Sequence, residues 1–144
     1  MANLPVNIAK RELKVIEKRL KWDKGLLEAV EVEHSQGPGN ILTIEIESEH
    51  ITEGFTGFGK RGVSAETVAK RTATAVQEYL AFDVPVGRHL ADQLLLPMAL
   101  AGGGKYCTLS PTKHTTTNGE IIKRFINVDT TLTEYDQNQW VIEI

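Results

Sequence analysis

The stretch "NILTIEIESEHITEGFTGFGKRG", residues 40–62, predicts the first sheet of this protein. Up to His50 it alternates apolar and polar residues with a period of two, the pattern of a strand with one buried face. From Ile51 it continues as a second strand that ends in glycines. Upstream, "GLLEAVEVEH" (25–34) alternates in the same way, and "GPGN" (37–40) supplies turn residues between the alternating segments. We therefore expect 25–34 and 40–50 to form an antiparallel pair.

Helical patterns flank these strands. In "LPVNIAKRELKVIEKRL" (4–20), four apolar residues stand at helical spacing: Ile8, Leu13, Ile16 and Leu20. Downstream, "SAETVAKRTATAVQEYLAF" (64–82) opens with Ser64, followed by Glu66 and Thr67, which predicts a capped helix. The order helix, strands, helix indicates a small α+β unit.

The pattern changes after Asp83, and we predict a domain boundary there. "VPVGRHLADQLLLPMALAGGG" (84–104) is a mostly apolar helix closed by three glycines. A short strand, "KYCTLSP" (105–111), and a helix, "TTNGEIIKRFI" (116–126), follow. The last two segments, "NVDTTLTEY" (127–135) and "QWVIEI" (139–144), predict a closing hairpin about "DQNQ". The whole chain is thus predicted to be α+β.

Composition limits the class of protein. With 144 residues, of which 41% are hydrophobic and 24% charged, the chain is long enough to bury a core in one or two small domains. A net charge of -3 gives no bulk attraction to polyanions, so contact with RNA would need a local basic patch. Cys107 is the single cysteine, and no apolar run resembles a secretion signal or a membrane span. We expect a cytoplasmic protein with no membrane segment.

Two groups of residues are candidates for chemistry. His114, in "HTTTN", could be a nucleophile or general base, because imidazole is partly unprotonated near neutral pH. A surface or capping histidine is the alternative. Asp92 and Gln93 are neighbours in an apolar helix, so at least one should face the core or a cleft. The alternative there is a helix-edge pair that neighbouring backbone satisfies.

Other motifs predict structure and not chemistry. "GGGK" (102–105) lacks the spacing of a phosphate-binding loop and precedes a strand, so we predict a helix C-cap. The histidines are widely separated in the sequence, so no metal site is predicted from His34, His50, His89 and His114.

Three blocks of the sequence carry a family resemblance. They are "SQGPGNILTIEIESEHITEGFTGFGKRGVSAE", "VGRHLADQLLLPMALAGGGKY" and "SPTKHTTTNGEIIKRF", in that order. Together they resemble the C-terminal part of RNA 3'-terminal phosphate cyclases, over essentially all 144 residues. Members of this family combine a large domain of βαβαββ repeats with a small inserted α+β domain. The resemblance implies that 1–82 is most of the insert, with its first strand missing, and that 83–144 is the C-terminal part of the large domain.

The resemblance also implies a reaction of the ligase class. Cyclases of this family use ATP, with Mg²⁺, to convert an RNA 3'-phosphate into a 2',3'-cyclic phosphate, releasing AMP and pyrophosphate. The reaction passes through a covalent histidine-AMP intermediate. His114 stands at the position of that nucleophile.

Further site residues follow from the same resemblance. Asp92 and Gln93 match the "DQ" pair beside the nucleotide, with the implied roles of orienting His114 and contacting ATP. His89 stands where family members often have a tyrosine that stacks on adenine. Basic residues that we expect near phosphate, or equally as solvated surface charge, are Lys113, Lys123 and Arg124.

The implied partners are RNA 3'-phosphate ends and ATP, with either a homodimer or pairing with the missing N-terminal region. Three alternatives stay open: part of an active cyclase, a noncatalytic cyclase-like assembly module or inactive fragment, and a fold relative of the enolpyruvyl transferases. His114 favours the first over a noncatalytic module, which lacks the nucleophile. "HTTTN" has no counterpart that we recognise in the transferases.

Overall fold

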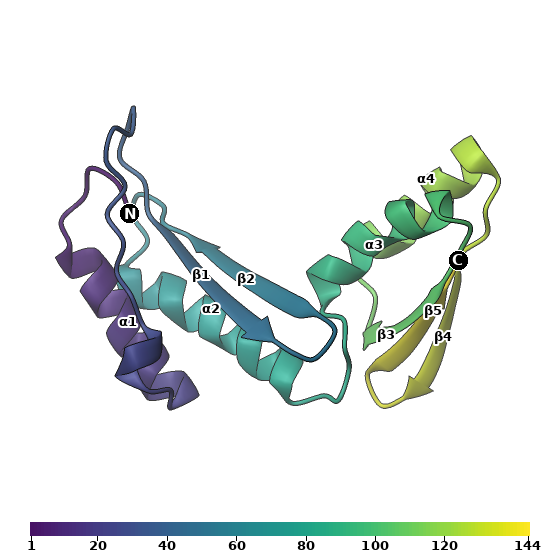
Figure 1. Cartoon of the computed structure of the whole chain (residues 1–144), viewed down its shortest axis with the longest axis horizontal. Coiled ribbons are helices and arrows are strands. Elements are labelled where there is room, and N and C mark those ends of the chain that lie inside the picture. Colours follow the sequence, from purple (N-terminus) through teal and green to yellow (C-terminus); the bar gives the residue numbers. More distant parts are fainter. The chain divides into compact units, whose positions relative to one another are not determined.

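The computed structural model describes residues 1–144 and divides into two compact units. The first unit comprises Met1–Ile46 with Gly54–Glu78, and the second comprises Glu47–Glu53 with Tyr79–Ile144. Four α-helices and five strands make up most of the chain (Figure 1). The α+β class is therefore confirmed, whereas the repeat architecture of a larger domain stays a prediction. No helix is long and apolar enough to cross a bilayer.

Helix α1 (Asn7–Leu20) is the amphipathic helix that the sequence predicts. Ile16, which is 1% exposed, lies on its buried face together with Ala9 and, unexpectedly, Glu12. The helix ends where Lys21 adopts a left-handed conformation, and a short 3-10 turn, η1 (Lys24–Leu26), follows.

Strands β1 (Ile41–Glu47) and β2 (Thr52–Phe58) pair with each other in a two-stranded sheet. Both strands agree with the sequence prediction, but the predicted strand at 25–34 is wrong, because 27–34 contains no strand. There, Val30 and Val32 are more than half exposed, and both form backbone hydrogen bonds with Met1 instead of with a strand. Alternation specifies a strand only where a neighbouring strand offers both a hydrogen-bond ladder and a buried face.

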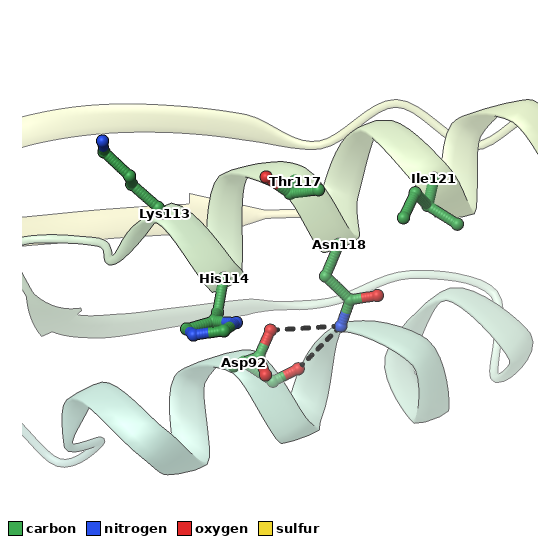
Figure 2. Close-up of a pocket in the computed structure, with 6 residues that line it drawn as sticks. All are labelled: Asp92, Lys113, His114, Thr117, Asn118 and Ile121. Atoms are coloured by element: carbon green, nitrogen blue, oxygen red, sulfur yellow. Dashed lines mark hydrogen bonds between the residues drawn. The ribbon is translucent and has the colours of Figure 1, made fainter.

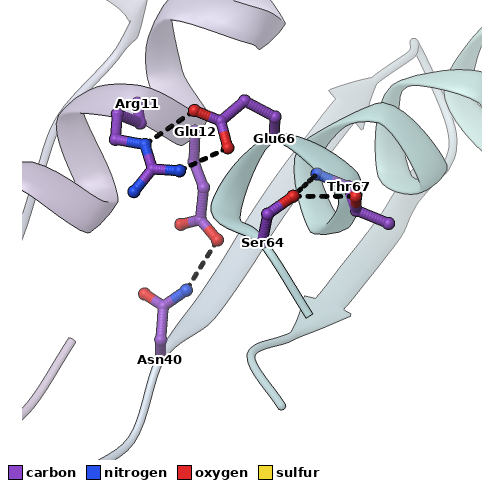
Figure 3. Close-up of polar contacts among 6 residues, drawn as sticks. All are labelled: Arg11, Glu12, Asn40, Ser64, Glu66 and Thr67. Atoms are coloured by element: carbon purple, nitrogen blue, oxygen red, sulfur yellow. Dashed lines mark hydrogen bonds and ion pairs between the residues drawn. The ribbon is translucent and has the colours of Figure 1, made fainter. Parts of the chain in front are cut away.

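Helix α2 (Ala65–Leu80) has the N-cap that the sequence predicts. The Ser64 hydroxyl accepts a hydrogen bond from the Thr67 backbone N–H at 3.2 Å. Glu66 in the first turn forms a two-pronged ion pair with Arg11 of α1, with both N···O distances at 2.6 Å (Figure 3). The buried face of α2 is built from small and β-branched residues, Ala69, Ala73 and Val76. The Arg11–Glu66 ion pair thus joins α1 and α2 at the surface of the first unit.

The second unit has a three-stranded antiparallel sheet with the strand order β3-β5-β4. Its strands are β3 (Lys105–Leu109), β4 (Thr131–Asp136) and β5 (Gln139–Glu143), which confirms the predicted short strand and closing hairpin. Helices α3 (Arg88–Leu100) and α4 (Lys113–Ile126) belong to the same unit. Its core cluster consists of Val86, Ala91, Leu95, Ala99, Tyr106, Ile122 and Ile142.

Both ends of α3 are determined by close backbone contacts. At its C-terminus, Gly102 and Gly103 have positive φ angles, and the Gly103 N–H donates to the Met98 carbonyl at 2.9 Å, which confirms the predicted glycine cap. At its N-terminus, the buried carboxylate of Glu53 accepts from the Gly87 N–H at 3.1 Å. Burial raises the pKa of Glu53, and the hydrogen bond from Gly87 opposes that shift.

Candidate active site

Helix α4 begins at Lys113, three residues earlier than the predicted start at 116. Thr112 is the N-cap, and its hydroxyl accepts from the Thr115 backbone N–H at 3.3 Å. A threonine before the "HTTTN" block thus caps the helix, a role that the sequence alone does not assign to one of several adjacent threonines. As a consequence, His114 lies in the first turn of α4, where backbone N–H groups lack partners within the helix.

An open pocket of about 440 Å³ lies over this first turn, with one wall from α3 and one from α4 (Figure 2). Its α4 residues recur every three or four positions and so share one face of the helix. The lining residues are Asp92, Lys113, His114, Thr117, Asn118 and Ile121. The pocket therefore combines an exposed imidazole, an ammonium group, a hydroxyl and a carboxylate.

A forked hydrogen bond holds the carboxylate of this pocket. Asn118 Nδ2 donates to Asp92 Oδ1 at 3.1 Å and to the Asp92 backbone carbonyl at 3.3 Å (Figure 2). Both residues are half-buried, so water competes less with these bonds than it would at the surface. The fork uses one carboxylate oxygen of Asp92, and the Asp92 side chain lines the pocket that also holds His114.

Tyr106 supports the same turn of α3 from the sheet. Its hydroxyl donates to the Ala91 carbonyl at 2.5 Å, next to Asp92 in the chain. Burial, and to a smaller degree the Asp92 carboxylate, raises the pKa of Tyr106, so the phenol remains a hydrogen-bond donor throughout the neutral range. The α3 backbone at Ala91 and Asp92 thus accepts hydrogen bonds from two side chains, those of Tyr106 and Asn118.

The three threonines after His114 have different roles. Thr115 is 1% exposed and serves the helix cap. The Thr116 hydroxyl donates back to the Lys113 carbonyl at 3.1 Å. Only Thr117 lines the pocket.

The structure brings Asp92 and His114 to one pocket, but Gln93 and His89 are not among its lining residues. Both are exposed on α3. Asn118 is the residue that the sequence prediction missed. Its position four residues after His114 places it on the same helix face, which was the available signal.

The described residues contain no group of three histidine, cysteine or acidic side chains that could hold a metal ion. Asp92 is the single carboxylate lining the pocket. Mg²⁺ in nucleotide sites commonly relies on one or two carboxylates, with the remaining ligands from phosphates and water. Asp92 fits that limited role, and no dedicated metal cage is present.

Known proteins resemble both units of this chain. The family model described as the RNA 3'-terminal phosphate cyclase (RTC) insert domain matches residues 1–81. The RNA 3'-terminal phosphate cyclase of Ectopseudomonas mendocina is 38% identical over all of this chain and 42% of its own length. That of Koribacter versatilis is 45% identical over 93% of this chain and 38% of its own length.

A third relative, the RNA 3'-terminal phosphate cyclase of Pseudomonas fluorescens, is 42% identical over 88% of this chain and 37% of its own length. The chain thus spans about two-fifths of the length of these curated relatives. Because the insert-domain model matches more than half of the 144 residues, and the relatives extend the match beyond it, the chain belongs to the RNA 3'-terminal phosphate cyclase family.

Proposed function

We propose that this chain is the C-terminal portion of an ATP-dependent RNA 3'-phosphate cyclase, with His114 as the nucleophile that becomes adenylylated. The observation that carries the proposal is that His114 and Asp92 line one pocket, at the first turn of α4, in a chain of the cyclase family. In this proposal the insert-like domain spans 1–82 and the C-terminal part of the large domain spans 83–144.

The first step is attack by an unprotonated His114 ring nitrogen on the α-phosphorus of ATP. The new N–P bond forms as the bond to pyrophosphate breaks, which gives a histidine-AMP phosphoramidate and free pyrophosphate. Lys113 and the N-terminus of α4 place positive charge and free N–H groups near the phosphates. Magnesium, when bound, supplies further neutralisation of phosphate charge, and Asp92 is the lining residue that would contribute a ligand.

The second and third steps move AMP and then close the ring. An oxygen of the RNA 3'-phosphate attacks the AMP phosphorus, and the imidazole of His114 leaves. The adjacent 2'-hydroxyl then attacks the terminal phosphorus, AMP leaves, and the 2',3'-cyclic phosphate forms. Adenylylation is needed because a free phosphate monoester offers no good leaving group.

Asp92 is proposed to orient His114, since the two residues line one pocket and Asn118 holds the Asp92 carboxylate in place. Gln93 and His89 are proposed to contact ATP at the edge of α3, with the imidazole of His89 stacking on adenine. Since both lie outside the lining, ATP bound in this way would extend beyond the pocket.

The proposed setting is cytoplasmic RNA processing, with RNA 3'-phosphate ends and ATP as partners. Because the chain spans about two-fifths of its relatives, we propose that activity needs the remainder of the relatives' length or pairing with another chain. A noncatalytic module is the second candidate, and the exposed imidazole in the pocket argues against it.

The proposal is tested by labelling a complete enzyme that carries this sequence with α-labelled ATP. We expect His114→Asn to take up no label, because an amide supplies no nucleophilic nitrogen. His50→Asn, at an exposed histidine between β1 and β2, is the matched control and should label normally. RNA that is already adenylylated should still cyclise with His114→Asn. Normal labelling of that variant would assign the nucleophile to another residue.

A further inference from the structure

A second cavity, also about 440 Å³, lies wholly within the first unit and shares no residue with the proposed cyclase site. It is bordered by the first residues of the chain, by α1, by the turn at 59–63 and by the start of α2. Apolar side chains form much of its wall: Leu4, Ile8, Val63 and Val68. Its volume is in the range of small-molecule pockets, roughly 300–1,000 Å³.

Two buried polar residues line this cavity. Glu12 is 2% exposed and Asn40 is 8% exposed. Asn40 Nδ2 donates to Glu12 Oε1 at 2.6 Å, and since a carboxylate can only accept, the amide nitrogen must face it. Burial raises the pKa of the Glu12 carboxyl, and the bond from Asn40 opposes that shift.

This bond occupies one oxygen of Glu12 and the amide nitrogen of Asn40, which leaves Glu12 Oε2 and Asn40 Oδ1 without a hydrogen-bond donor from the chain. Both oxygens lie on the same side of the pair (Figure 3). Neither is among the unpaired side-chain atoms that are sealed from solvent, so each keeps some contact with solvent. Two adjacent acceptors in a buried site favour a ligand with two adjacent N–H donors.

In contrast to the acceptor oxygens inside, the exposed edge of the cavity carries positive charge. Lys60 and Arg61 are exposed, border the cavity and form no ion pair with any acidic side chain. Gly62, between Arg61 and Val63, has φ +81° and lets the chain turn there. The N-terminus of α2 follows at Ala65, and its dipole adds positive potential. Cationic ligands such as amines or guanidinium groups are therefore disfavoured, although they are good donors.

A ligand with neutral N–H donors at one end and a negative charge at the other satisfies both regions. We propose that this cavity binds a guanine nucleotide, with the base edge on Glu12 and Asn40 and the phosphate at Lys60 and Arg61. Guanine presents N1–H and the N2 amino group side by side, so two donors meet two acceptors. Adenine and cytosine each present one amino donor beside an acceptor nitrogen. That nitrogen would face an acceptor oxygen of Glu12 or Asn40, which is unfavourable. Uracil presents a single N–H between two carbonyls.

Titration calorimetry of the full 144-residue chain with GMP, AMP, CMP and UMP tests the proposal. We expect GMP to bind roughly tenfold or more tightly than the other three, because a mismatched edge leaves a buried acceptor unpaired. A short RNA with one guanine, compared with GMP, distinguishes a guanine within RNA from a free nucleotide as the source. Equal affinity for all four mononucleotides, or no binding of any of them and of the RNA, would overturn the proposal.

Two variants separate base recognition from phosphate attraction. Glu12→Gln preserves shape, since its carbonyl can accept from Asn40, but it replaces Oε2 by an N–H₂ donor. We expect GMP affinity to fall roughly tenfold or more, with the melting temperature as the check on folding. Glu17→Gln, a less buried carboxylate on the same helix, is the matched control and should bind normally.

Lys60→Glu changes an exposed residue, so it tests the phosphate contact without a folding penalty. It should weaken every nucleotide and reduce the salt dependence of binding. Lys10→Glu, exposed on α1 and outside the cavity lining, is its control. GMP binding that survives both Glu12→Gln and Lys60→Glu would place the nucleotide elsewhere. His114→Asn should leave GMP binding unchanged, so failure of this proposal is distinguishable from failure of the cyclase proposal.

Discussion

Asn118 of α4 donates its amide nitrogen to both the carboxylate and the backbone carbonyl of Asp92 on α3, at 3.1 and 3.3 Å. One side chain thereby links the two helices that line the candidate active site. The same contact restricts the rotamer of Asp92. A residue in this position can affect both the stability of the second unit and the geometry offered to His114.

The Asn118–Asp92 contact should appear as a coupling in a double-mutant cycle. Asn118→Ala and Asp92→Ala should each lower the free energy of unfolding by about 1–2 kcal/mol, because both groups are half-buried. The double variant should lose less than the sum of the two. Thr117→Ala, at the exposed neighbour, is the control and should change stability little. Additive losses measured by denaturant unfolding would show that the bond contributes nothing in solution.

Two glycines of β2 should respond differently to the same substitution. A Cβ at Gly57 would lie 2.2 Å from the hydroxyl oxygen of Thr72, whose side chain is buried on α2. Gly57→Ala should therefore destabilise the chain by roughly 1–3 kcal/mol. A Cβ at Gly54, in the same strand, would meet no atom within 4 Å, so Gly54→Ala should be neutral or slightly stabilising. Thermal unfolding of both variants compares them, and equal melting temperatures would contradict the close contact.

The Arg11–Glu66 ion pair predicts a pH dependence. The hydrogen bond from the Arg11 guanidinium lowers the pKa of Glu66 from its ordinary value of 4.5 to about 2. Since the folded value is the lower one, the contribution to stability is present above pH 4.5 and is lost as the pH falls towards 2. The difference in melting temperature between wild type and Glu66→Gln should thus shrink over that range.

Salt should weaken the same contribution, because Arg11 and Glu66 are both partly exposed. Glu28→Gln, at an exposed carboxylate, is the comparison variant. A difference between wild type and Glu66→Gln that stays constant from pH 7 to pH 2 would show that the pair does not form.

Substitutions at Gly87 and Glu53 should be coupled in their effects on stability, because an added side-chain atom at Gly87 would clash with Glu53. Gly87 has φ -77°, which any residue can adopt, but an added Cβ would lie 2.5 Å from Glu53 Oε1. Gly87→Ala should cost roughly 1–3 kcal/mol of stability by displacing that carboxylate. In a Glu53→Ala background the same substitution should cost much less, since the space is then free. Chemical denaturation of the four proteins measures this, and an undiminished cost would locate the conflict elsewhere.

Local signals in the sequence were sufficient for most individual elements. Alternation predicted β1, Ser64 predicted the cap of α2, and the glycines at 102–104 predicted the end of α3. Each of these depends on residues only a few positions apart, where backbone geometry and capping chemistry act directly. The three sequence blocks, which include "HTTTN", also predicted the family, since a family resemblance is itself a property of residue order.

Contacts between distant segments could not be predicted in the same way. The alternating segment at 25–34 is not a strand, and β1 pairs with β2, since strand pairing depends on which segments the fold brings together. Asn118 meets Asp92 across 26 positions, and Asn40 meets the buried Glu12 across 28. Only the tertiary structure decides such pairs, because burial removes water and makes each polar group depend on whichever partner the fold brings within hydrogen-bond distance.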